Sequence, residues 1–214
     1  MSFNTLAVID DNDTVREGYR YVANMARLNP QVWSGKIESS LTSLLANGIG
    51  ADAALSDYQL TQSGYATFNG ADLVAGLYRR RTPAVLCTRF DRAAIDTIRP
   101  LLRWIPVVLA PNELDPGSLL RSLKIAQDEL SGTFISERRP WRAQVHFLYR
   151  DDIVTDAYFV ELPGWSGSEI LKVRLSMLPS DVAERVNDGY RTFARVNLGT
   201  EDVERIYLDE WEVR

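Results

Sequence analysis

Short apolar runs alternate with helix-like segments from the N-terminus to Gly132, and this alternation restricts the fold more than any other feature of the chain. Because strand, helix and parallel strand form the repeating unit of α/β folds, the pattern predicts a parallel sheet with helices on its faces. The expected strands are 6–9, 31–37, 53–57, 84–87 and 105–109, and the expected helices start near residues 14, 39, 71, 92 and 116. Five strands and five helices are then complete by residue 132.

Two of these helices carry signals at their ends. Thr14 and Glu17 have the spacing of a capping box, and apolar residues then recur on one helical face at Val15, Tyr19, Val22 and Ala26. The last helix has Asp115 in the N-cap position, Pro116 directly after it and Gly132 just beyond its end.

The second part of the chain changes its period from helical to alternating. Val145, Phe147 and Tyr149 are expected on one face of a strand. The expected strands are 144–149, 157–162, 170–175, 190–197 and 203–208, with one short helix at about 180–186. We therefore predict a small β-rich barrel or sandwich domain at 133–214, following an α/β domain at 1–132.

Composition and charge restrict the possible partners. Residues 1–132 carry a net charge of −1 and residues 133–214 carry −4, so the second part is a poor candidate for nucleic-acid binding. The single cysteine, Cys87, lies in an apolar run and indicates a reducing compartment. No apolar stretch approaches the roughly 20 residues that span a bilayer. We expect a soluble, cytoplasmic protein without nucleic-acid or membrane partners.

Polar residues follow three of the predicted strands. Asp10 and Asp11 follow the first strand, Asp57 ends the third and Thr88 follows the fourth. Because open α/β sheets bind ligands outside the carboxyl ends of their strands, these side chains are expected at one edge. Clustered carboxylates need a cation, which suggests Mg²⁺-dependent phosphorylation of an aspartate.

With these residues in place, residues 4–131 resemble the receiver domain of two-component response regulators. The resemblance implies a flavodoxin-like parallel sheet in the order 2-1-3-4-5. It also implies that Asp10 and Asp11 hold Mg²⁺ together with Asp57 and the backbone carbonyl of Gln59. Asp57 is then the phosphoryl acceptor and Thr88 the hydroxyl that senses the phosphoryl group. The implied partners are a sensor histidine kinase and, through the fourth and fifth helices, a second copy of the chain.

The chain departs from the receiver pattern at three places. Receivers have a lysine before the proline that follows the fifth strand, where this chain has Ala110, and Val107 stands at the position of their switch aromatic. The loop after Asp57 contains no proline and reaches Gly70 only 13 positions later, like an insertion. Arg89 is a candidate replacement cation, although an arginine directly after a strand is typically solvated.

Two other functions stay open at this point. The departures favour a phosphorylation-independent receiver-like interaction module. Asp11-Asn12-Asp13-Thr14 also resembles the nucleophile motif of haloacid-dehalogenase-type phosphatases, with Thr88 and then Lys124 or Asp151-Asp152 as later motifs, but Asp57 has no role there.

For residues 133–214 we predict an interaction domain that binds another protein, because this part is acidic and shows no catalytic constellation. Trp165 lies in a Gly-rich turn, where it could contact a partner instead of the core. We expect no enzymatic activity beyond phosphorylation and dephosphorylation of Asp57.

Overall fold

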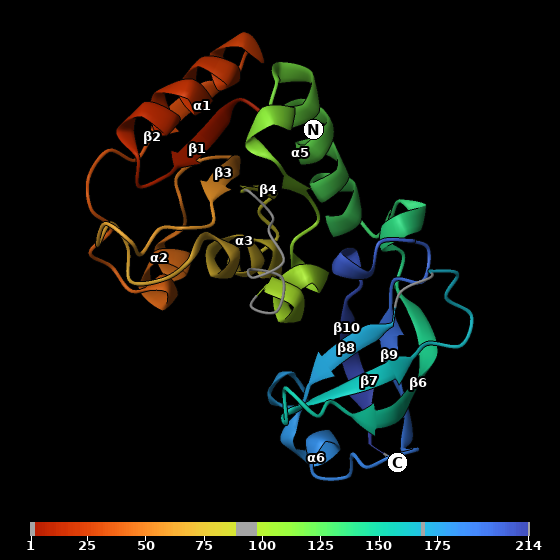
Figure 1. Ribbon diagram of the computed structural model, residues 1–214. Helices are drawn as coiled ribbons and strands as arrows, with labels where there is room; N and C mark the ends of the chain where they lie inside the picture. Colours follow the sequence, from red (N-terminus) through yellow and green to blue (C-terminus); the bar gives the residue numbers. More distant parts are fainter. Residues whose placement is uncertain (1–2, 89–97, 168–169, 214) are drawn as a thin grey trace. The chain divides into compact units, whose positions relative to one another are not determined.

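The computed structural model of the protein describes residues 3–88, 98–167 and 170–213. The chain forms two compact units, which are coloured along the sequence in Figure 1. The first unit comprises Met1–Ala94 and Trp104–Phe134, and the second comprises Ile95–Arg103 and Ile135–Arg214. The second unit is thus built from two separate stretches of the chain.

The first unit contains a five-stranded parallel sheet in the order β2-β1-β3-β4-β5. Its strands are β1 (Thr5–Ile9), β2 (Asn29–Val32), β3 (Ala53–Asp57), β4 (Ala84–Cys87) and β5 (Val108–Leu109). The predicted flavodoxin-like strand order is therefore confirmed. All four residues from Leu6 to Ile9 are fully buried, as expected when helices cover both faces of a parallel sheet.

The helices of this unit are α1 (Asp13–Met25), α2 (Leu41–Asn47), α3 (Gly70–Arg79) and α5 (Pro116–Leu130). The ends predicted for the last helix are confirmed, with the Asp115 side chain accepting from the Ser118 N–H. Part of the helix expected from residue 92 lies outside the described residues; its end is a 3₁₀ helix, η1 (Arg99–Trp104).

The predicted start and buried face of α1 need correction. Asn12, and not Thr14, is the N-cap, because its side chain accepts from the N–H groups of Thr14 and Val15. The earlier start turns Arg16 toward the interior and leaves Val15 36% exposed. The capping box and part of the predicted apolar face were therefore wrong.

The second unit contains a five-stranded antiparallel sheet in the order β10-β9-β6-β7-β8. Its elements are β6 (Trp141–Arg150), β7 (Ala157–Glu161), β8 (Leu171–Arg174), α6 (Ser180–Ala183), β9 (Arg191–Val196) and β10 (Leu208–Glu212). The predicted β-rich character is confirmed, but the last strand begins at Leu208 instead of Val203. Residues Val203–Arg205 form a 3₁₀ turn, η5, which the Asp202 side chain caps.

Two aromatic side chains of this unit bear on the predictions from the sequence. Val145 and Phe147 are fully buried, but an irregularity in the pairing after Phe147 leaves Tyr149 49% exposed. Trp165 is half-buried against the core, and its indole N–H donates to the Thr200 carbonyl at 2.6 Å. This hydrogen bond and the core contacts hold the ring, which favours core packing over the alternative of a freely exposed tryptophan.

Gly70 offers a test of how the loop after Asp57 returns to the sheet. A Cβ atom at this position would lie 1.6 Å from the backbone oxygen of Asp57, whereas one at Gly18 would meet nothing within 4 Å. We expect Gly70→Ala to destabilise the protein by about 1–3 kcal/mol, as overpacking does. Gly18→Ala, in the exposed face of α1, should stabilise it by about 1 kcal/mol. Chemical denaturation measures both, and equal effects would contradict the close approach.

Candidate functional site

The carboxyl ends of β1, β3 and β4 lie together at one edge of the parallel sheet. Strand pairing aligns Ile9 with Ser56, and Asp57 with Cys87. A cavity of about 400 Å³ opens at this edge, and we call it the acidic cavity. Its lining includes Asp10, Asp11, Asn12, Asp57, Gln59, Thr88 and Pro111. All five predicted site residues therefore line one cavity, although they come from three separate stretches of the chain.

Asp10 is the most buried of the three acids, with 3% of its surface exposed. Its Oδ1 atom accepts a hydrogen bond from the Asn12 N–H at 2.7 Å. Burial, together with the nearby carboxylates of Asp57 and Asp11, raises the pKa of Asp10 to about 6, against the opposing effects of the Asn12 N–H and of Arg16. At neutral pH the cavity thus holds a buried negative charge that the surrounding groups only partly stabilise.

Asp57 ends β3, and its Oδ2 atom accepts the Gln59 N–H at 2.6 Å. Burial raises the pKa of Asp57, and the carboxylate of Asp11 adds to this, while the N–H groups of Gln59 and Tyr58 oppose it. No lysine or arginine of the described part of the chain contributes to these effects. The Asp57 carboxylate therefore has backbone donors as its stabilising partners.

Thr88 follows directly after β4 and is 5% exposed. Its N–H donates to the Leu109 carbonyl at 2.9 Å, which joins the end of β4 to β5. Its neighbour Cys87 is fully buried, as predicted, and burial raises the pKa of this thiol to about 11. Thr88 is thus a fixed residue whose side chain lines the cavity beside Asp57.

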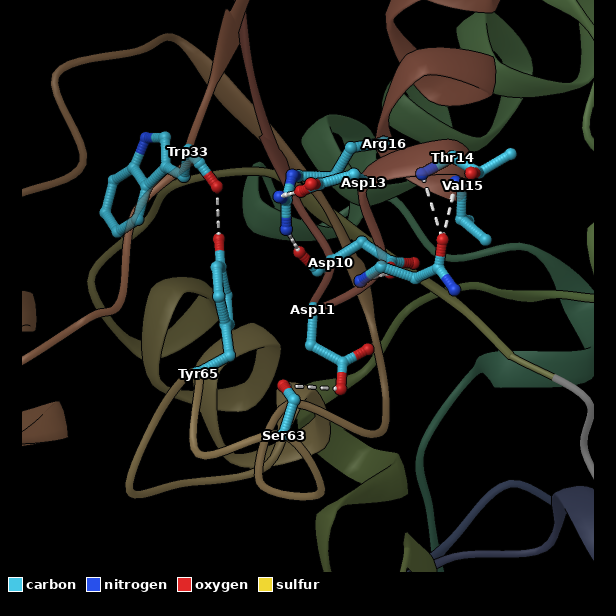
Figure 2. A network of polar contacts seen from close by, with 10 residues as sticks. Asp10, Asp11, Asp13, Thr14, Val15, Arg16, Trp33, Ser63 and Tyr65 are labelled. Carbon is cyan, nitrogen blue, oxygen red and sulfur yellow. Dashed lines mark hydrogen bonds and ion pairs between the residues drawn. The ribbon is translucent and has the colours of Figure 1, made fainter.

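A second set of contacts, which the sequence did not indicate, lies beside the acid pair (Figure 2). Arg16 is buried, and its guanidinium donates to the backbone carbonyl of Asp10 and pairs with the carboxylate of Asp13. The same group lies 5.3 Å from the centre of the Tyr65 ring. Tyr65 is held in turn, because its hydroxyl donates to the Trp33 carbonyl at 2.6 Å.

The long loop after Asp57 also reaches the acid pair directly. Ser63 donates its hydroxyl to Asp11 Oδ2 at 2.9 Å, and Figure 2 shows the Asp11 side chain directed at this residue. Tyr65 is 5% exposed, so the loop is packed against the unit. The unusual length of the loop was visible in the sequence, but the contacts of Ser63, Tyr65 and Arg16 were not.

The lining residues suit Mg²⁺ in kind, because this ion prefers carboxylate and carbonyl oxygens. Each acid, however, is bound to a donor of its own chain: Asp10 to Asn12, Asp11 to Ser63 and Asp57 to Gln59. Within residues 3–88, 98–167 and 170–213, no three histidine, cysteine or acidic side chains are grouped closely enough to hold a metal ion. The three carboxylates share a cavity without converging on one point.

Several solved structures that resemble this chain are receiver domains of response regulators. One from Clostridium thermocellum is 13% identical, with a TM-score of 0.44, and the match covers 60% of this chain and 97% of that domain. The N-terminal domain of a response regulator/sensory box/GGDEF protein from Carboxydothermus hydrogenoformans is 12% identical, with a TM-score of 0.45, and the match covers 60% of this chain and 98% of that one. A CheY-like receiver from Methanospirillum hungatei is 14% identical, with a TM-score of 0.44, and the match covers 61% of this chain and 98% of that one. The fold assignment itself rests on the strand order described above.

The sequence matches no protein-family model and no curated protein. Over the described residues, no helix combines the length and the hydrophobicity that crossing a membrane requires.

The residues that the phosphatase interpretation needs are engaged elsewhere. Lys124 forms an exposed ion pair with Asp128 one turn along α5. Asp151, in the second unit, accepts from the N–H groups of Ile153 and Val154 and pairs with Lys172 at 2.5 Å. Neither Lys124 nor Asp151 is among the described residues that line the acidic cavity.

The raised pKa of Asp10 predicts a dependence of stability on pH. Because the folded state binds this proton more tightly than the unfolded state, Asp10 stabilises the fold below about pH 4, and this contribution is lost as the pH rises through about 6. In the presence of a chelator, Asp10→Asn should therefore be more stable than the wild type at pH 7, by up to about 3 kcal/mol, and similar to it at pH 4. Denaturant titrations measure this difference, with Asp152→Asn as an exposed control. A difference that is the same at both pH values would contradict the assignment.

Proposed function

We propose that this chain is a response regulator of two-component signal transduction, whose first unit accepts a phosphoryl group on Asp57 from a sensor histidine kinase. The observation that supports this most directly is the joint lining of one cavity by Asp10, Asp11, Asp57 and Thr88 at the carboxyl edge of the sheet. Two acids and a hydroxyl surrounding a third acid, in a sheet of this order, suit phosphorylation of that third acid.

Asp57 is the nucleophile of the proposed reaction. Its Oδ2 accepts the Gln59 N–H at 2.6 Å, and we assign the attack to the other oxygen, Oδ1. The bond from Oδ1 to phosphorus forms as the bond from phosphorus to the donor's nitrogen breaks, and the nitrogen keeps the electron pair. Because burial raises the pKa of Asp57, the carboxylate must lose its proton before it can attack.

Mg²⁺ is the proposed cofactor, with Asp10, Asp11, Asp57 and the Gln59 carbonyl as the residues that would hold it. When bound, the ion neutralises the negative charge that otherwise repels the phosphoryl group. Ala110 stands where receivers have a lysine, and Arg89 lies outside the described residues. The acids must therefore turn from their present hydrogen-bond partners toward the cation. Because the lysine is missing, this cation has to compensate a larger share of the negative charge of the carboxylates and the phosphoryl group.

Thr88 is the proposed sensor of the phosphoryl group. Its hydroxyl lines the cavity next to Asp57, and a phosphoryl oxygen on Asp57 is a strong acceptor for it. When the hydroxyl donates to this oxygen, the Thr88 side chain changes its orientation at the end of β4. The proposal includes no catalytic activity beyond phosphoryl exchange at Asp57.

The alternative is a receiver-like interaction module that does not use phosphate. Ala110, Val107 and the absence of convergence among the three acids favour this function. In both cases we propose that the second unit binds another protein, because its excess of acidic residues disfavours nucleic acid.

Beryllofluoride, which imitates an aspartyl phosphate, distinguishes the two functions. In millimolar Mg²⁺ we expect ¹⁹F NMR to show a bound species with the wild type, none with Asp57→Asn, and an unchanged signal with the control Asp128→Asn on α5. Absence of binding to the wild type would contradict phosphorylation of Asp57 and support the interaction module that does not use phosphate. Turnover of p-nitrophenyl phosphate would instead support the phosphatase.

The missing lysine predicts a gain of function. Ala110 precedes Pro111 of the cavity wall, so an ammonium group introduced there can reach a phosphoryl group on Asp57. We expect Ala110→Lys to increase beryllofluoride affinity by about tenfold, the typical contribution of a charge-assisted hydrogen bond. Ala110→Met is the uncharged control of similar length. An equal affinity of both variants would show that a cation at this position has no effect.

A further inference from the structure

The chain between β4 and β5 leaves the unit that contains both strands. Residues 95–103 group with the second unit, and the chain returns to the first unit at Trp104. Within this stretch Ile98 is fully buried and Leu102 is 3% exposed. A connection between neighbouring parallel strands normally packs on its own sheet, so its membership of another unit needs a physical explanation.

Arg99 lies within this stretch and binds it to η5. The guanidinium is buried, and its NH1 group donates to the carbonyls of Val203 at 2.8 Å and Ile206 at 3.0 Å. These two carbonyls lie at the start of η5 and just beyond its end. A buried guanidinium is costly to leave unpaired, and the two carbonyls of this turn are acceptors for it.

Arg138 holds the same stretch from the opposite side. It is 9% exposed, and it donates to the carbonyls of Leu102 at 3.0 Å and Arg103 at 3.1 Å. These are terminal carbonyls of η1, which lack partners within a helix that ends there. Arg138 thus acts as a side-chain cap for η1, donated from a part of the chain 35 residues away.

Tyr207 connects the two arginine sites. It is fully buried, and its hydroxyl donates to the Arg138 carbonyl at 2.6 Å, while its ring lies 5.4 Å from the Arg138 guanidinium and 5.7 Å from that of Arg103. Its N–H donates to Asn197 Oδ1 at 2.8 Å. The stretch, η5 and the entry to β10 are therefore parts of one buried polar network.

We propose that residues 98–103 are a structural element of the second unit, and that they transmit the state of Asp57 to it. Ile98 follows Thr88 by only ten positions, so the cavity wall and the network are joined directly by the chain. A change at Thr88 then acts on an element that the second unit requires for its own stability. The structural half stands on the contacts alone, and the regulatory half rests on the proposed function.

Hydrogen exchange of the full-length protein tests the structural half. Arg99→Lys and Arg138→Lys keep the charge but replace the planar guanidinium by a compact, more strongly hydrated ammonium group. We expect amides of 98–104 and of 203–211 to exchange about tenfold or more faster in both variants, with those of β1 and α1 unchanged. Arg139→Lys, an exposed neighbour, is the control. Acceleration no greater than in the control, or confined to 98–104, would overturn the proposal.

Beryllofluoride tests the regulatory half, with ¹⁹F NMR reporting its binding independently. In Mg²⁺, binding to the wild type should alter exchange in 98–104 at least threefold, and Asp57→Asn should show no change. Binding without altered exchange would overturn transmission while leaving the proposed function intact. Absence of binding would overturn both the transmission and the proposed function. The exchange rates of the arginine variants would still decide whether residues 98–103 are a structural element of the second unit.

Discussion

The parallel register of β1, β3 and β4 is the constraint on which the rest of the structure depends. It brings the ends of three buried strands to the same level, so residues 10, 57 and 88 meet although long stretches of chain separate them. The side chains of these strands are buried on both faces of the sheet, so a shift of register would disrupt their packing against the helices. The polar residues therefore have little freedom to leave the edge, and their proximity is maintained at an electrostatic cost.

The electrostatic cost is visible in the partners of the cavity carboxylates. Arg16 is the buried cation nearest the acids in the described network, yet it is bound to the Asp10 carbonyl and to Asp13 instead of a cavity carboxylate. The carboxylates of Asp10 and Asp57 are stabilised mainly by backbone N–H groups, and burial raises the pKa of both. Perturbed acids of this kind are characteristic of functional sites. An external cation would lower the free energy of the ionised cavity more than any group that lines it.

The features predicted from the sequence are those set by local pattern. The ends of α5, the strand order and the residues lining the cavity follow from caps, apolar runs and strand direction. The errors arise where two local signals compete or a distant contact decides. Asn12 displaced Thr14 as the N-cap and rotated α1, and the irregular pairing after Phe147 turned Tyr149 outward. The hydrogen bonds of Ser63 and Tyr65 join residues more than 30 positions apart, so no periodicity indicates them.

The assignment of residues 95–103 to the second unit changes the meaning of the departures near β5. With valine at position 107, an aromatic swing cannot transmit the state of the site. A stretch held by Arg99 and Arg138 does not need one, because it belongs to the second unit and is covalently continuous with β4. A buried guanidinium with its carbonyl partners has one favourable arrangement and no inexpensive intermediate, which is the requirement for a two-state response. The valine at position 107 and the arginine network are therefore both consistent with the proposed route from the acidic cavity to the second unit.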